Sequence, residues 1–114
     1  MSRPSLPPVP LKLREMLAPY PDLIERIQDV LVYSAERSRK IRLMPFDDAV
    51  SMLEGQLEEF ISEARTDLAM AEASKDDSAI DLASRRELAV SMARQKRHWI
   101  TDESLAIYFG KDFS

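Results

Sequence analysis

The sequence predicts an all-α fold: a small helical bundle with a long central amphipathic helix in an antiparallel helical hairpin, plus short N- and C-terminal helices. Three observations support this prediction. Helix-forming residues dominate, and only 2 glycines occur in 114 residues. β-Branched residues are sparse and do not alternate with polar ones, as they would in a half-buried strand. Apolar residues instead recur at intervals of three and four, the spacing of one face of a helix.

A proline-rich segment precedes the helices. Four of the 7 prolines lie within residues 1–10, and proline fixes φ and lacks a backbone N–H. We therefore expect an extended arm at residues 1–9, followed by a single helical domain at residues 10–114. A chain of 114 residues suits one domain with a core of its own.

Prolines also divide the N-terminal part of the domain into two helices. Pro10 suits the first position of a short helix, and Pro19 ends that helix because the residue before a proline avoids the helical conformation. Pro21 then opens a second helix, which runs to about Arg39 and carries apolar residues at helical spacing. Cations gather at its C-terminal end, where they suit the helix dipole.

The longest helix follows Pro45 and carries the most regular apolar stripe in the sequence. All residues of the stripe fall on one side of a helical wheel. The stripe consists of Phe46, Val50, Leu53, Leu57, Phe60, Ala64, Leu68 and Ala71. This helix is therefore the expected centre of the bundle.

The stretch after the stripe favours a turn, which would make the next helix an antiparallel neighbour. Ser78 can cap that helix, with Asp81 three residues later, and the helix would cover about residues 79–99. No glycine or proline lies within residues 72–79. One continuous helix over residues 46–100 is therefore the alternative.

A last short helix closes the chain. Thr101 can cap its start, and Gly110 suits the left-handed conformation just past its end. The apolar residues at this end of the chain are expected to fold back onto the bundle. Contact with a partner through Tyr108, Phe109 and Phe113 is the alternative.

Charge is distributed unevenly along the chain, whose net charge is −4. Residues 47–77 hold 10 acidic and 2 basic side chains, whereas residues 78–100 hold 5 basic and 2 acidic ones. Acids on the long helix stand four residues apart, as with Glu54 and Glu58, and each such pair destabilises a helix by roughly 0.2–0.5 kcal/mol. Compensating cations are therefore expected nearby.

The compensation has two candidate sources. One is internal, from the basic residues of the following helix: Arg85, Arg86, Arg94, Lys96 and Arg97. The other is a cationic partner, because the acids outnumber these cations and two methionines on the same helix lie off the apolar stripe. This second source predicts a partner-binding surface formed by Glu54, Glu58, Glu59, Glu63, Asp67, Met52 and Met70.

The sequence lacks the motifs of common catalytic and metal sites, so we expect no enzyme activity, no cofactor and no bound metal. It has no cysteine and one histidine, His98, so zinc ligation by this chain would need carboxylates. No HExxH pattern, EF-hand loop, phosphate-binding glycine loop or Glu-x-x-His pair is present. We interpret His98 as a helix-end residue.

Two basic clusters, at residues 37–42 and 94–98, have the composition of phosphate contacts, and Trp99 could stack on a base. The strongly acidic stretch between the clusters disfavours this reading. We interpret the clusters as solvated helix ends and Trp99 as a core residue.

Together these features predict a small acidic protein–protein interaction module that binds and masks a basic partner protein. An inhibitor, an immunity protein or an antitoxin has this build, with a toxin or effector as its partner. An acidic face speeds the encounter with a basic one. The alternatives are a self-associating structural or regulatory helical protein, such as a homodimer, and, less favoured, a nucleic-acid-binding regulator.

No apolar run approaches the length of a membrane span, and the lack of cysteine fits a reducing cytoplasm, so we expect a cytoplasmic protein without a membrane partner.

Overall fold

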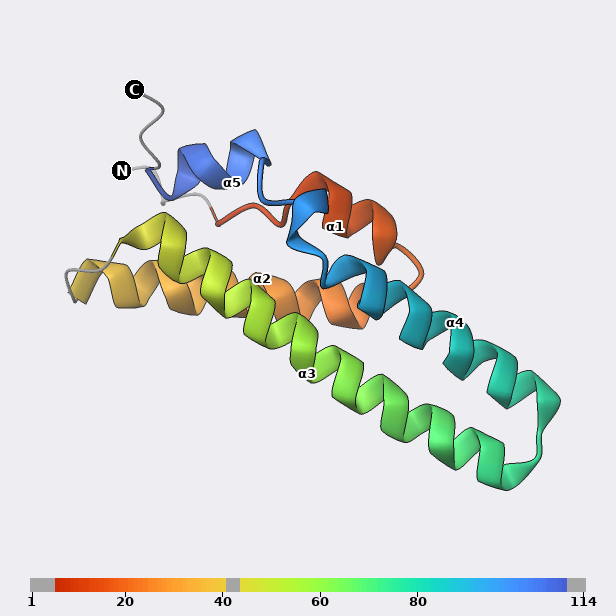
Figure 1. Cartoon of the computed structure of the whole chain (residues 1–114). Coiled ribbons are helices and arrows are strands. Elements are labelled where there is room, and N and C mark those ends of the chain that lie inside the picture. Colours follow the sequence, from red (N-terminus) through yellow and green to blue (C-terminus); the bar gives the residue numbers. More distant parts are fainter. Residues whose placement is uncertain (1–5, 41–43, 111–114) are drawn as a thin grey trace.

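A computed structural model describes residues 6–40 and 44–110, and within these ranges the chain is helical and contains no strand (Figure 1). The long central helix pairs with the helix that follows it, so the predicted all-α bundle with a helical hairpin is confirmed. The elements are α1 (Leu11–Met16), α2 (Pro21–Lys40), α3 (Pro45–Ser74), α4 (Asp77–Ala93), the 3₁₀ helix η1 (Lys96–His98) and α5 (Glu103–Tyr108).

Helix α3 is the centre of the bundle because its apolar stripe supplies much of the core. It packs against α4 along one flank and against α2 along the other. Six stripe residues are buried: Phe46, Val50, Leu53, Leu57, Phe60 and Ala64. The last two, Leu68 and Ala71, are only half-buried, which shows that the core ends before the helix does.

Helix α2 covers the first two thirds of α3 with residues spaced four apart. Leu23, Ile27 and Leu31 are all fully buried. One turn later the buried Ser34 hydroxyl donates to Asp48 Oδ2 at 2.7 Å. The same side of α2 therefore changes from apolar packing to a polar contact near the start of α3.

The short helices α1 and α5 close the bundle on the side of α4 (Figure 1). Leu13, Leu17, Leu105 and Phe109 from these helices and their ends join the core. The apolar C-terminal cluster thus folds back onto the bundle, as expected. Phe113 lies outside the described residues.

The described part of the proline-rich arm lies against the bundle. Residues 6–10 are not helical, and Val9 belongs to the hydrophobic core. The Gln28 side-chain amide donates to the Pro7 carbonyl oxygen. The domain boundary at residue 9 stays a prediction.

The structure corrects two predicted helix starts. Asp76, not Ser78, caps α4, because its Oδ1 accepts the backbone N–H groups of Ser78 at 3.0 Å and Ala79 at 3.3 Å. Asp102, not Thr101, caps α5 by accepting the N–H of Leu105 at 2.9 Å. In both cases the capping aspartate lies one or two residues from the predicted hydroxyl residue, and a carboxylate is the stronger acceptor.

The helix ends also differ in part from expectation. A turn separates α3 from α4, so one continuous helix from 46 to 100 is ruled out, and Lys75 supplies the left-handed residue with φ of 59°. Helix α4 ends at Ala93 rather than near residue 99. Gly110 adopts a left-handed φ of 70°, as predicted.

The molecule is elongated, with extents of 53 × 25 × 25 Å and a radius of gyration of 16.0 Å. A compact domain of this length would have a radius of gyration of about 13 Å. The difference arises because the end of α3 and the start of α4 project beyond α2 as a two-helix hairpin (Figure 1). Among the described helices, none is both long and apolar enough to cross a membrane.

Candidate partner-binding surface

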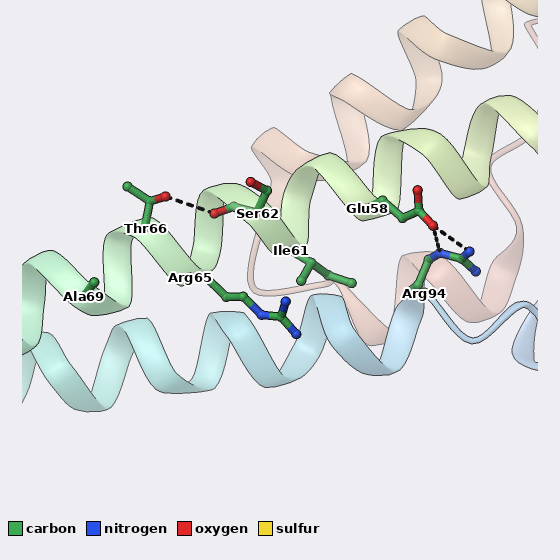
Figure 2. Close-up of a pocket in the computed structure, with 7 residues that line it drawn as sticks. All are labelled: Glu58, Ile61, Ser62, Arg65, Thr66, Ala69 and Arg94. Carbon is green, nitrogen blue, oxygen red and sulfur yellow. Dashed lines mark hydrogen bonds and ion pairs between the residues drawn. The ribbon is translucent and has the colours of Figure 1, made fainter.

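Two of the predicted site carboxylates lie on the α4 flank of α3 and are held by cations of the same chain. Arg94 Nη2 lies 2.8 Å from Glu58 Oε1 and 3.3 Å from Glu54 Oε2. Lys96 Nζ lies 3.8 Å from Glu54 Oε1. Figure 2 shows Arg94 reaching across from α4 to Glu58.

Two more of these carboxylates lie on the α2 flank and face Arg26. Its guanidinium forms a two-pronged contact with Glu63, at 2.7 Å and 2.8 Å, and lies 3.8 Å from Glu59. It also lies 4.7 Å from the centroid of the Phe60 ring. The hydrogen bonds from Arg26 lower the pKa of Glu63 below its ordinary value, because they favour the ionised carboxylate.

Four of the five predicted acids are therefore ion-paired within the chain, and their part in partner binding stays a prediction. The fifth, Asp67, has no ion pair among the described residues and is exposed. Met70, one turn further, is 67% exposed. Met52 instead lies half-buried in a groove of about 300 Å³ between α2 and α3, beside Tyr33.

A larger groove, of about 750 Å³, follows the other side of the α3–α4 pair (Figure 2). Its polar groups bond mainly to one another: Glu58 to Arg94, and the Thr66 hydroxyl to the Ser62 carbonyl oxygen at 3.1 Å. Arg65 Nε lies 3.7 Å from Glu87 of α4. The groove is open to solvent.

The projecting hairpin carries the charge that the bundle leaves uncompensated. We call residues 66–84 the distal hairpin; they hold 5 acidic and 1 basic side chain, a net charge of −4. The whole chain also has a net charge of −4, so the rest of the chain is neutral. Within the described residues, the one ion pair of these acids is Asp81 with Arg85, at 3.1 Å along α4 itself.

The distal hairpin also has no buried residue. Every position from 65 to 89, a stretch that includes the distal hairpin, is half-buried or exposed, whereas Ala64 and Val90 on either side of this stretch are buried. Met70 and Leu82 are among the large apolar side chains that remain exposed. Two helices pack here, and no third element among the described residues covers them, unlike the α2–α3–α4 part of the bundle.

Each basic cluster has a structural partner for some of its described cations. Arg37 Nε lies 3.8 Å from Asp48 Oδ1, and Arg94 and Lys96 bind the acids of α3. Trp99 is 1% exposed, so its ring is not presented to a base. Residues 41–43, which include the end of the first cluster, lie outside the described residues.

Two residues were not predicted from the sequence: Arg26 as a neutralising residue and Leu82 as part of the exposed surface. Arg26 lies on α2, whereas the compensating cations were expected on the helix after the turn. Its position next to the buried Ile27 and one turn after Asp22 was a usable signal for a flank facing another helix. Nothing in the sequence alone placed Leu82 beyond the start of α2.

The Arg26 contacts give a stability prediction. Replacing Arg26 with methionine should lower the free energy of unfolding by about 1–2 kcal/mol, because it removes a two-pronged ion pair and a cation–π contact at a partly exposed site. Urea denaturation measures this change. Arg85→Met is the control, since Arg85 pairs within its own helix and should shift stability by no more than about 0.5 kcal/mol. Equal effects of the two substitutions would contradict the assignment.

Comparison with protein-family models, with curated proteins and with solved structures gives no match.

Proposed function

We propose that this protein is a small acidic interaction module that binds a basic partner protein and masks its cationic surface, as an inhibitor, immunity protein or antitoxin does. The proposal depends mainly on one observation. The distal hairpin, residues 66–84, has a net charge of −4, which equals the net charge of the whole chain. Ion pairs from α2 and α4 neutralise the middle of α3, so the part available to a partner is the projecting end.

Electrostatics gives a reason for this arrangement. A negative patch on a projecting element attracts a positive surface and raises the rate of encounter. Single surface ion pairs contribute little, about 0–1 kcal/mol each, so affinity also needs apolar contact. Met70 and Leu82 supply exposed apolar surface beside the acids.

Self-association is the second candidate, because an uncovered hairpin is also an interface that two copies can share. Stacking two distal hairpins would bring two charges of −4 together, which opposes that arrangement. We therefore expect light scattering to give the mass of a monomer, 13.0 kDa. A stable dimer would support the second candidate instead.

Affinity capture followed by identification tests the proposal, with the whole protein as bait at about 50 and 300 mM salt. The expected partner is basic and is released at the higher salt. The double substitution Asp67→Lys and Glu72→Lys should abolish capture. The control Glu25→Lys and Asp29→Lys makes the same charge change on α2 and should keep it. Partners without a basic surface, or equal capture by both variants, would refute the proposal.

A further inference from the structure

The proposed function leaves open what kind of partner segment the hairpin receives, and the packing of α2 supplies an answer. We infer that the side of the distal hairpin in line with α2 docks a basic amphipathic helix of the partner protein, about three turns long. This inference rests on the proposed function and adds the location and the chemistry of the contact.

The face of α3 that packs against α2 continues along α3 onto the distal hairpin. Glu63 contacts Arg26 of α2, and Asp67 and Met70 follow it at four and seven residues, the spacing of one helix face. Met52, in the groove between α2 and α3, lies 18 residues before Met70, which is about five full helical turns. Asp67 and Met70 are therefore oriented as the α2-facing residues are, but they lie beyond the start of α2.

Helix α4 contributes the other half of the same surface. Arg86 Nη2 contacts Asp22 Oδ2 at the start of α2, at 2.8 Å, and lies 5.1 Å from the Tyr20 ring centroid. Leu82 and Ala79 precede Arg86 by four and seven residues, so they continue its face beyond the start of α2. Leu82 is 66% exposed, and the half-buried Ala79 allows a partner backbone to approach closely.

The geometry of α2 indicates what fits this surface. Over the bundle, α2 covers α3 with Leu23 and Ile27, which are buried, and places Arg26 against the acids. A partner helix that lies on α3 in line with α2 would present apolar residues four apart to the hairpin and a cation to Asp67. From Ala64 to the end of α3 at Ser74 the free part of α3 is about 15 Å long at 1.5 Å per residue, which sets the length at about three turns.

Charge selects a basic helix over a second copy of this chain. The distal hairpin has a net charge of −4, and Asp67 has no ion pair among the described residues. A second copy would meet this surface with the same charge. A lysine- or arginine-bearing helix would bring the opposite charge to the flanks and apolar residues to Met70 and Leu82.

The test uses the whole protein and a fluorescent peptide of about 15 residues in which leucine and lysine form an amphipathic helix. A peptide of the same composition, scrambled to remove the apolar face, is the matched probe. Fluorescence anisotropy should show salt-dependent binding of the amphipathic peptide and at least about tenfold weaker binding of the scrambled one. Hydrogen exchange should show protection confined to residues 66–84.

Two double variants separate the contact surface from charge alone. Met70→Ser with Leu82→Ser should weaken binding about tenfold or more. Leu88→Ser with Met92→Ser removes the same residue types from exposed positions of α4 on a different face, and should leave binding unchanged. Leu88 lies two residues after Arg86, about 200° around the helix.

The outcomes test the docking surface, the inferred partner helix and the proposed function separately. Equal binding by both double variants, or equal binding of both peptides, overturns the docking surface but leaves an acidic module that binds cations. No binding of either peptide overturns the inferred helix, whereas the capture experiment with the charge-reversed hairpin decides the proposed function. Protection of residues 66–84 in the free protein together with a dimeric mass would assign the surface to a second copy and overturn the inference.

Discussion

Replacing Trp99 with alanine is expected to lower the free energy of unfolding by about 3–5 kcal/mol, the range for truncating a buried aromatic side chain. The indole is 1% exposed and is the largest fully buried side chain among the described residues. Its Nε1–H donates to the carbonyl oxygen of Ala93 at 2.9 Å. Ala93 is the last residue of α4, where helix carbonyls lack helical partners, so the indole both fills the core and caps the helix.

Two further substitutions separate these contributions. Trp99→Phe keeps an aromatic ring but leaves the Ala93 carbonyl without its donor, which should cost about 1–3 kcal/mol. Tyr33→Ala removes an aromatic side chain that is 55% exposed and should change stability by no more than about 0.5 kcal/mol. Urea denaturation followed by circular dichroism is the appropriate measurement, since Trp99 is the single tryptophan and the variants lose its fluorescence. A loss below about 1 kcal/mol for Trp99→Ala would show that the C-terminal segment is not anchored there.

This result would also bear on the interaction surface. Domains of this size are stable by about 5–15 kcal/mol, so Trp99→Ala would remove a large share of the total. The distal hairpin lies away from Trp99 and has no buried residue of its own. Variants such as Leu82→Ser should therefore be nearly neutral for stability, which makes them suitable for binding experiments.

The helices could be predicted from the sequence because periodic burial and proline positions act locally. Pro21 and Pro45 open α2 and α3 as expected, and the predicted stripe is buried from Phe46 to Ala64. The stripe continues in the sequence to Ala71, yet burial stops. Periodicity reports which side of a helix is apolar and cannot report whether another element covers it.

The turn between α3 and α4 shows a second limit. Neither glycine nor proline marks it, and Lys75 takes the left-handed conformation, which is unfavourable for a residue with a side chain. The cap formed by Asp76 and the packing of α3 against α4 stabilise the turn. A local sequence pattern could suggest this break but could not decide it.

The candidate site was predictable only where it depended on one helix. The acidic excess could be counted, and pairing with Arg94 and Lys96 followed from the expected hairpin. Pairing of Glu63 with Arg26 depends on α2 lying beside α3, across 37 residues of sequence. The division into a neutralised middle and an uncompensated distal hairpin is therefore a tertiary property, and it moves the proposed contact from the centre of α3 to its end.

Asp102 gives the second large effect, because one carboxylate stabilises the start of two helices. Its Oδ2 accepts the N–H of Leu11 at the start of α1, at 2.9 Å, and its Oδ1 accepts the N–H of Leu105 in α5, at 2.9 Å. Asp102→Ala removes a helix cap and leaves a second donor unpaired, so it should lower the free energy of unfolding by about 2–3 kcal/mol. Glu103→Ala in the same turn is the control and should have a small effect, since Glu103 is exposed.

The charge of Asp102 makes this stabilisation depend on pH. Burial raises the pKa of Asp102, but hydrogen bonds from Ser104, Leu105 and Leu11 favour the carboxylate and together lower it below the ordinary value. A carboxyl group with a lower pKa in the folded state stabilises the protein above its unfolded pKa, and that stabilisation is lost as the pH falls through the folded pKa.

Asp102→Asn removes the charge at similar shape, so the stability difference from the wild type should be largest near neutral pH and should shrink between about pH 4 and pH 2. Asp22 and Glu63, whose pKa values are also lowered by arginine partners, are present in both proteins and cancel in this comparison. A difference that stays constant over the whole pH range would mean that the geometry of the two caps, and not the negative charge, accounts for the role of Asp102.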